Sequence, residues 1–415
     1  MRVVYIHQFF ATRESPLGLI RSYEFGRRMV EAGHEVIMIT SSSRLSPEYS
    51  GRVFARGAID GIEIRSVRVS YSNYMGYTRR IISFLTFTIG ATWLAVTAPR
   101  PDVVFATSTP LTVGIPGWIA AALRRIPFVF EVRDLWPEAA IQMGALSRTG
   151  ILGRIAKTLE RFLYRRSSAV IALSPGMAEG ILAEGVPRER VHMIPNSCDL
   201  DLFHPGAKDP ELVERYALGD RFIVGYAGAI GPSNAVEDSV PGAARILKDR
   251  GRDDIVFLIA GDGKSLPGIR EAKEREGLDN LILVGSMPKH DVPRLTRTAD
   301  ALMTLFADVP ILYTNSPNKF FDGLATGRPM IVNSPGWTRE LIETNGAGVY
   351  IAPGDAEALA DAIEKLADDP DTVTRMGKNA RALAEERFGR DDLAVQFMTV
   401  LRDATRIAPD RVRPE

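Results

Sequence analysis

Residues 316–329 have the sequence SPNKFFDGLATGRP, and a short apolar run, MIV, follows them directly. Pro317 prevents a helix from entering this stretch from upstream, and Asn318 is a favourable helix cap. The apolar residues that follow recur at helical spacing until Gly327 and Pro329 end the run. The stretch therefore predicts a loop, a helix that begins near Asn318, and a strand.

The predicted start of this helix has the chemistry of an anion site. Backbone amides and the positive end of the helix dipole attract phosphate there, and Lys319 adds a full charge within the first turn. Asp322 lies one turn further along, where a carboxylate can accept hydrogen bonds from the two vicinal hydroxyls of a ribose. We therefore expect the helix to bind the diphosphate and ribose of a nucleotide-sugar donor. The other donor contacts expected in this segment and just before it are Thr314, Asn315, Ser316, Asn318 and Phe320.

Short apolar runs alternate with helical stretches on both sides of this segment, which predicts parallel sheets covered by helices on both faces. The first set of runs lies at 3–7, 36–40, 62–67, 103–106, 128–132, 169–173 and 191–194. The second set lies at 222–227, 255–260, 281–285, 301–305, 330–332 and 349–351. The expected fold class is α/β, with two doubly wound, Rossmann-like parallel-sheet domains facing a central cleft.

Chain length and turn-forming residues set the expected domain boundaries. A chain of 415 residues exceeds one ordinary core, and residues 195–206 are dense in turn formers. We expect an N-terminal, acceptor-side domain at 1–203 and a C-terminal, nucleotide-sugar-binding domain at 207–387. The helix at 388–407 is expected to pack back on the N-terminal domain, and the tail at 408–415 to be disordered.

The net charge of zero conceals an asymmetry between the two halves of the chain. Residues 1–200 carry 24 Lys and Arg against 16 Asp and Glu, which leaves 27 against 35 for residues 201–415. The halves are therefore +8 and −8. A basic N-terminal half favours an anionic partner, such as a phosphorylated acceptor or a membrane surface, although uneven basic faces are also common. We expect no nucleic-acid partner.

Cys198 is the single cysteine, and the chain begins with a strand-like run rather than a signal-peptide pattern. Both features predict a cytoplasmic protein. The basic N-terminal half adds the expectation of association at the inner face of the cytoplasmic membrane. Residues 81–98 contain 18 residues without a charge, which is the lower limit for a membrane span. Their four Thr, one Ser and one Gly favour a buried or membrane-facing helix instead.

Several familiar motifs are absent. The string AGDGKS at 260–265 has Leu258 where a Walker phosphate loop needs a glycine. No GxGxxG follows the first strand of either domain, which disfavours a nicotinamide-dependent dehydrogenase. Gly228 and Gly231 follow the first strand of the second domain, where they either admit a diphosphate to the backbone or simply turn the chain. The five His are scattered and no acidic cluster has ligand spacing, so we expect no metal and no cofactor.

A second candidate group ends a hydrophobic strand of the N-terminal domain. Arg133 is expected to neutralise the charge on a departing diphosphate, and Asp134 to orient Arg133 or receive an acceptor proton, so these are the candidate catalytic residues. The alternative is a local salt bridge that caps the strand. His7, Arg21 and Glu131 belong to the same edge and are candidate acceptor contacts. A glycosidase using Glu131 and Asp134 is disfavoured because hydrolysis leaves the phosphate-binding helix unexplained.

Motifs along nearly the whole chain carry a family resemblance. They are HQFF at 7–10, RSYEF at 21–25, GHEV at 33–36, ATS at 106–108, PFVFEVRDLWP at 127–137, SPGM at 174–177, IPNSCDLDLF at 194–203, YAG at 226–228 and the segment at 316–329. With these motifs the chain resembles the family-4 retaining glycosyltransferases of the GT-B fold. It is most similar to the subgroup that includes N-acetyl-fucosaminyltransferases of O-antigen and capsule assembly.

This resemblance implies transfer of a sugar from a nucleotide-diphosphate-sugar to an acceptor, with retention of configuration and without a metal. The nucleotide-sugar is then a co-substrate. The implied acceptor is a lipid-linked saccharide in cell-envelope polysaccharide synthesis, and a small-molecule, secondary-metabolite acceptor is the alternative. A nucleotide-sugar 2-epimerase and an inactive scaffold of the same fold are alternatives from other classes.

The resemblance also shows where this chain departs from the family pattern. Asp322 stands where the family's ribose-binding residue is usually Glu, and Thr314 stands where many members have the Glu that touches the donor sugar. Arg133 stands where many members carry a His. The Arg and Lys usual after the first strand of the second domain are replaced by the sequence GPSN at 231–234. Gly18 corresponds to a glycine-rich turn near the donor phosphate.

Overall fold

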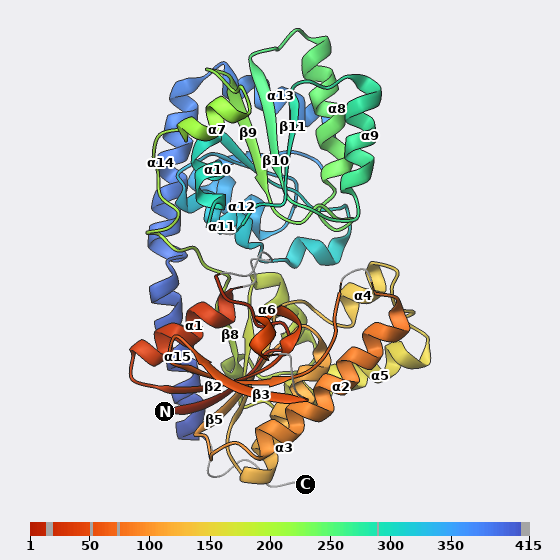
Figure 1. The fold of residues 1–415 in the computed structure, drawn as a ribbon, viewed down its shortest axis with the longest axis vertical. Coiled ribbons are helices and arrows are strands. Elements are labelled where there is room, and N and C mark those ends of the chain that lie inside the picture. The colour runs from red at the N-terminus through yellow and green to blue at the C-terminus, as the bar shows by residue number, and fades with distance from the viewer. Residues whose placement is uncertain (14–19, 50–52, 73–74, 289, 408–415) are drawn as a thin grey trace. The chain divides into compact units, whose positions relative to one another are not determined.

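The structure is a computed structural model that describes residues 1–13, 20–49, 53–72, 75–288 and 290–407. The chain divides into two compact units. Unit 1 contains Met1–Pro195 and the C-terminal segment from Asp391, and unit 2 is Asn196–Arg390. Each unit contains one sheet and its own helices (Figure 1).

The sheet of unit 1 has the strand order β3-β4-β2-β1-β5-β6-β7-β8. Its strands are β1 (Arg2–Ile6), β2 (Glu35–Ser41), β3 (Phe54–Ile59), β4 (Ile62–Val67), β5 (Val103–Thr107), β6 (Phe128–Val132), β7 (Ala169–Ala172) and β8 (Val191–Met193). All neighbours are parallel except β3, which pairs antiparallel with β4. The sequence prediction missed β3 because this edge strand has no buried apolar run.

Helices cover both faces of this sheet. They are α1 (Arg21–Glu31), α2 (Tyr77–Val96), α3 (Gly114–Arg124), α4 (Glu138–Gln142), α5 (Ile151–Arg166), α6 (Pro175–Ala183) and α15 (Arg390–Ile407), with short 3-10 turns η1 (Ser42–Arg44), η2 (Pro47–Tyr49), η3 (Leu111–Val113) and η4 (Arg188–Arg190). On one face Phe25 of α1 and Phe397 of α15 pack in one cluster with Tyr5. On the other face Gly117 of α3 lies so close to the Phe128 ring that a Cβ there would be 2.6 Å away.

Helix α2 contains most of the charge-free stretch found in the sequence. A helix there is confirmed, since α2 covers Tyr77–Val96. A search of the described residues finds no helix whose length and apolarity suffice to cross a membrane. The favoured interpretation of this stretch as a helix of the N-terminal domain therefore agrees with the structure.

The sheet of unit 2 consists of six parallel strands in the order β11-β10-β9-β12-β13-β14. They are β9 (Phe222–Ala227), β10 (Ile255–Ala260), β11 (Leu281–Gly285), β12 (Ala301–Thr304), β13 (Met330–Val332) and β14 (Gly348–Tyr350). Each begins and ends within one residue of its predicted range. The predicted α/β class with two parallel-sheet, Rossmann-like domains is confirmed, with β3 as the antiparallel exception.

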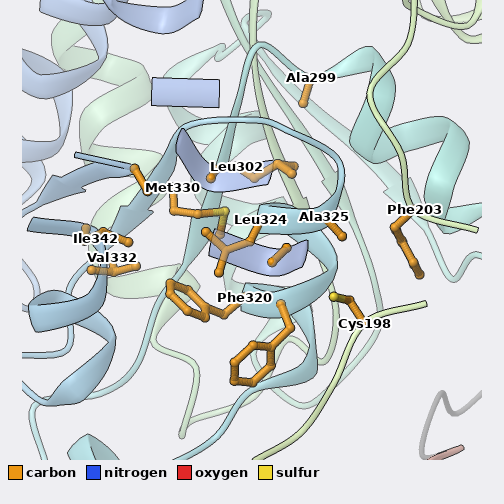
Figure 2. Packing of buried hydrophobic residues seen from close by; sticks show 14 of the residues in the cluster. Cys198, Phe203, Ala299, Leu302, Phe320, Leu324, Ala325, Met330, Val332 and Ile342 are labelled. Atoms are coloured by element: carbon orange, nitrogen blue, oxygen red, sulfur yellow. The ribbon is translucent and has the colours of Figure 1, made fainter. Parts of the chain in front are cut away.

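Two core clusters flank this second sheet, one on each face. The helices are α7 (Pro210–Arg215), α8 (Val236–Asp249), α9 (Leu266–Glu276), α10 (Val292–Thr298), α11 (Asn318–Ala325), α12 (Trp337–Asn345), α13 (Ala356–Ala367) and α14 (Pro370–Arg387), with the 3-10 turn η5 (Pro310–Thr314). Figure 2 shows the cluster around α11, in which Phe320, Leu324 and Met330 pack together.

Candidate donor and acceptor sites

Helix α11 begins at Asn318, as predicted, but Asn318 is not its cap. Pro317 occupies the cap position and no side chain caps the helix. The amide of Phe320 donates to the carbonyl of Pro317 at 3.1 Å. Within the described chain, the amides of Asn318 and Lys319 have no acceptor. Two backbone donors at the positive end of the helix dipole are thus available to an anion.

The apolar face of α11 fixes this helix start in place. Phe320 and Phe321 are fully buried, and their ring centroids are 5.4 Å apart. Leu324 packs in the same cluster as Phe320 (Figure 2). The predicted donor contact Phe320 therefore has both its ring in the core and its amide bonded to Pro317. What it contributes is the position of the neighbouring Lys319.

Lys319 extends from α11 to the carboxyl end of β9. Its Nζ donates to the hydroxyl of Tyr226 at 2.6 Å and to Oδ1 of Asn234 at 2.8 Å. The ammonium lies 4.3 Å from the centroid of the Tyr226 ring. Both hydrogen-bond partners are neutral, and burial lowers the pKa of Lys319 to about 7. An arriving anion would supply the opposite charge that these partners do not.

Gly228 makes room for this lysine. A Cβ added at Gly228 would lie 3.0 Å from Cε and 3.1 Å from Nζ of Lys319. A Cβ at Gly231 would meet nothing within 4 Å. Gly228 therefore acts by admitting a side chain, and Gly231 lies at an open position of the same loop.

The glycines of the AGDGKS string allow two backbone segments to pack closely. A Cβ at Gly261 would lie 1.8 Å from the carbonyl oxygen of Gly228, and one at Gly263 would lie 2.1 Å from that of Ile230. The amide of Ile230 donates to the carbonyl of Asp262 at 2.9 Å. The string packs backbone against backbone and supports the loop that contains Gly228.

The residues just before α11 bond within unit 2. The Thr314 hydroxyl donates to the carbonyl of Ile311 at 2.7 Å, and the Trp337 indole donates to the carbonyl of Asn315 at 2.8 Å. The predicted donor contacts Thr314 and Asn315 thus already hold the loop.

Ser316 is also engaged, because Asn196 donates through its backbone amide to the Ser316 hydroxyl at 3.1 Å and through its side-chain amide to the Ser316 carbonyl at 2.5 Å. Asp322 is 4% exposed and lies one turn after Lys319 on α11. Its charge raises the pKa of Cys198 in addition to the larger effect of burial. The structure therefore brings Lys319 and Asp322 onto one helix start, held by a bonded loop.

At the carboxyl edge of the unit 1 sheet, Arg21 and Glu131 form a buried ion pair. Two guanidinium nitrogens of Arg21 donate to Oε1 of Glu131 at 3.1 and 2.9 Å, and Thr107 donates to Oε2 at 2.6 Å. Arg21 also donates to the carbonyls of Ile194 and Pro195. The two ionic side chains are 2% and 0% exposed. These candidate acceptor contacts thus tie three strand ends together, and the strand-capping salt bridge uses Arg21 rather than Arg133.

His7, Arg133 and Asp134 lie beside this pair. Arg133 Nη1 is 3.5 Å from His7 Nε2, and Asp134 accepts a hydrogen bond from the Thr109 hydroxyl at 3.1 Å. Burial first, and then the charges of Arg133 and Arg44, hold the pKa of His7 well below its usual value. Burial raises the pKa of Asp134. The edge thus combines a neutral imidazole, a carboxyl group with a raised pKa and a guanidinium.

Arg44 is a member of this edge that the sequence reasoning missed. It ends η1, just after β2, and its guanidinium carbon lies 4.9 Å above the centroid of the Phe9 ring. Burial lowers the pKa of Arg44, and the charge of Arg133 lowers it further. The sequence could have indicated Arg44, because it follows the second predicted strand and the carboxyl ends of parallel strands share one edge of the sheet.

Gly18 lies outside the described residues. Among the residues that the structure describes, no group of three or more His, Cys, Asp or Glu could hold a metal ion. In unit 2, a lysine, two helix amides and a carboxylate one turn away form a group whose chemistry fits a diphosphate and a diol.

Both halves of the chain match models of glycosyltransferase domains. Residues 20–197 match the model of the glycosyl transferase 4-like domain, and residues 209–383 match that of the glycosyl transferases group 1. The sucrose-phosphate synthase from Thermosynechococcus elongatus superposes with a TM-score of 0.75 at 18% identity, over 98% of this chain and 100% of that one. The fold is thus that of the GT-B glycosyltransferases.

Curated relatives extend the comparison. Alpha-D-kanosaminyltransferase of Streptomyces kanamyceticus is 30% identical over 254 residues, 60% of this chain and 64% of that protein. The UDP-Gal:alpha-D-GlcNAc-diphosphoundecaprenol alpha-1,3-galactosyltransferase of Escherichia coli is 24% identical over 286 residues, 68% of this chain and 70% of that protein. With its two matched domains, this chain belongs to the group 1 glycosyltransferases that carry a glycosyl transferase 4-like N-terminal domain.

Proposed function

We propose that this chain transfers a sugar from a nucleotide-diphosphate-sugar to an acceptor. The observation that carries the proposal is Lys319, a cation with neutral partners at a helix start that has two available amides. A diphosphate supplies the charge and the acceptors that this group lacks. Asp322, one turn away, is assigned to the ribose hydroxyls.

Lys319 also offers a replacement for the Arg and Lys that the family pattern leads one to expect after β9. In place of that Arg and Lys, the loop has the sequence GPSN at 231–234. Asn234 of this loop accepts a hydrogen bond from Lys319, and Gly228 admits the lysine stem. We propose that one lysine from α11 provides the positive charge at the position from which the two usual cations are missing.

In unit 1 we assign Arg133 to the charge of the departing diphosphate and Asp134 to the acceptor proton. The raised pKa of Asp134 is in the direction required of a carboxyl group that exchanges protons near neutral pH. His7 remains a candidate acceptor contact, while Arg21 and Glu131 hold the strand ends in position. Transfer with retention of configuration and without a metal is part of the proposal and follows from the family resemblance.

The proposed acceptor is a lipid-linked saccharide of the cell envelope. The diphosphoundecaprenol-dependent galactosyltransferase among the relatives and the +8 charge of residues 1–200 support it. A small-molecule acceptor is the second candidate, favoured by the 30% identity to the kanosaminyltransferase.

One assay tests the reaction class. The purified protein is incubated with UDP-, GDP- and dTDP-sugars, with and without acceptor extracts, and released nucleoside diphosphate and altered sugar are measured. Release of nucleoside diphosphate that depends on acceptor is the expected result. An altered sugar on an intact nucleotide would instead indicate an epimerase, and absence of binding to every nucleotide would overturn the proposal. NMR of the product tests retention, and unchanged turnover in a chelator tests metal independence.

A further inference from the structure

Exposed apolar side chains are concentrated on one set of helices. Among the described residues, every large hydrophobic side chain classed as exposed belongs to unit 1 and none to unit 2. Eight of them lie on α2, α3 and α5. These eight, which we call the α2/α3/α5 face, are Ile82, Leu85, Ile89, Trp93, Leu123, Ile151, Leu152 and Ile155. This concentration on three helices makes the face a candidate interaction surface.

On α2 the exposed residues form a single stripe. Ile82, Leu85, Ile89 and Trp93 follow one another at spacings of three, four and four residues, so they lie on one side of the helix. Ile89 is 73% exposed and Trp93 62%. On the opposite side of α2, Phe87 and Ala91 are buried, and the helix packs against α3, β2 and β4. The helix therefore has two apolar sides, only one of which is needed for the fold.

The neighbouring helices continue this surface. Helix α3 packs against both α2 and α5, and Figure 1 shows the three helices together on one side of unit 1. At the start of α5, Ile151 and Ile155 are 73% and 58% exposed. Exposed apolar side chains are therefore found on three neighbouring helices and not on α2 alone.

The charges on these helices are almost all of one sign. The three helices carry eight cations, Arg79, Arg80, Arg124, Arg154, Lys157, Arg161, Arg165 and Arg166, against one acid, Glu160. Lys157 and Arg161 pair with Glu184 of α6's C-terminal end. Arg79 and Arg154 are exposed; Arg79 lies three residues before Ile82 on α2, and Arg154 directly precedes Ile155 on α5. The surface therefore combines exposed aliphatic groups, a tryptophan and excess positive charge.

We propose that the α2/α3/α5 face binds the surface of a membrane that contains anionic lipids. Apolar side chains and tryptophan enter the boundary of headgroups and acyl chains, while arginines pair with lipid phosphates. A second copy of the chain fits poorly, because a symmetric contact would bring together two surfaces that both carry an excess of positive charge. This assignment rests on the proposed function, since a lipid-linked acceptor would be met at that surface.

The test is co-sedimentation of the full chain with vesicles. We expect binding to an equimolar mixture of phosphatidylglycerol and phosphatidylcholine, and much weaker binding to phosphatidylcholine alone. Ile89→Ser/Trp93→Ser should lower the partition coefficient about 30-fold or more. Arg79→Gln/Arg154→Gln should lower it about fivefold for each arginine removed. The matched control is Val395→Ser, which changes a side chain 58% exposed on α15, outside the face.

The result that overturns the proposal is equal vesicle binding by Ile89→Ser/Trp93→Ser and Val395→Ser, or no binding by the native chain. Light scattering that shows self-association abolished by Ile89→Ser/Trp93→Ser would likewise overturn it, in favour of a second copy as occupant. Binding of nucleotide-sugar is measured on the same preparations. Nucleotide binding without vesicle binding rejects only the membrane face, whereas vesicle binding without nucleotide binding rejects only the proposed function.

Discussion

In unit 1, the guanidinium of Arg21 is buried against Glu131 and two backbone carbonyls, whereas in unit 2 the ammonium of Lys319 has Tyr226 and Asn234 as partners. Both cations lie at the carboxyl edge of a parallel sheet. The charge of Arg21 is compensated within the fold, and that of Lys319 is not. Position at a sheet edge is therefore insufficient to identify a ligand-binding cation, and the charge of its partners decides.

The largest expected effect comes from breaking the compensated pair. Glu131→Gln leaves the Arg21 charge buried without its counterion, so we expect a loss of about 3–5 kcal/mol in the free energy of unfolding. Urea denaturation measures this loss. The control is Glu138→Gln, which breaks the exposed pair with Arg148 and should cost less than about 1 kcal/mol. Equal effects of the two variants would show that the buried pair has no structural role.

Substitution of Lys319, whose charge has no counterion among its two hydrogen-bond partners, should affect ligand binding more than stability. Lys319→Ala is expected to weaken nucleotide-sugar binding by about 1.5–3 kcal/mol, as for loss of a charge-assisted hydrogen bond. Isothermal titration calorimetry measures the affinity, and Lys378→Ala on α14 is the control for removal of a surface lysine. An unchanged affinity in Lys319→Ala would remove this residue from the donor site.

The affinity for a nucleotide-sugar should depend on pH through Lys319. Since the pKa of Lys319 is lowered to about 7, the free chain loses this charge as pH rises through 7. Affinity should then fall by up to about 1.4 kcal/mol for each pH unit above 7. A nucleotide-sugar is the appropriate ligand, because its diphosphate diester does not titrate in this range. Lys319→Met should give a flat profile, and a slope equal to the native one in that variant would contradict the assignment.

The lowered pKa of Lys319 also makes the stability of the protein depend on pH. The direction follows from the number of protons bound by the folded and unfolded chains. Between pH 7 and the unfolded pKa of lysine, the unfolded chain binds the proton that folded Lys319 has lost. The Lys319 contribution to the free energy of unfolding therefore becomes more favourable as pH rises through this window. It is least favourable below pH 7, where the charged form is buried.

The smallest expected effect concerns the space that the lysine occupies. Gly228→Ala places a methyl group 3.0 Å from the Lys319 stem and should weaken nucleotide-sugar binding by about 1 kcal/mol as the lysine is displaced. Gly231→Ala, which meets nothing within 4 Å, is the matched control for the loop. A larger loss in Gly231→Ala than in Gly228→Ala would show that the ligand, and not the lysine, needs the glycine.

Features that depend on neighbouring residues in the chain, such as helix starts and apolar strands, could be predicted from the sequence. The α11 start followed from Pro317 and the apolar spacing after it, and each buried strand of unit 2 followed from its apolar run. Strand β3 was missed because an edge strand exposed to solvent needs no such run. Asn318 was placed at the cap by its side-chain propensity, whereas the fixed backbone of proline occupies that position.

The partners of the site residues were beyond local reasoning. The charge of Lys319 was evident, but Tyr226 and Asn234 lie far from it in sequence and meet it only because β9 and α11 share one edge. The pairing of Arg21 with Glu131 depends likewise on the start of α1 and the end of β6 lying at the same edge of the sheet. A sequence gives the residue types at an edge, while the fold decides which of them neutralise one another.

Gly261 and Gly263 explain why the string AGDGKS resembles part of a phosphate-binding loop. Backbone that must approach a phosphate and backbone that must approach another backbone share one requirement, the absence of a Cβ. Here the carbonyl oxygens of Gly228 and Ile230 occupy the space that a side chain would need. Grafting a residue larger than glycine into either position would therefore displace the neighbouring loop, so protein engineers should treat the two loops as one building block.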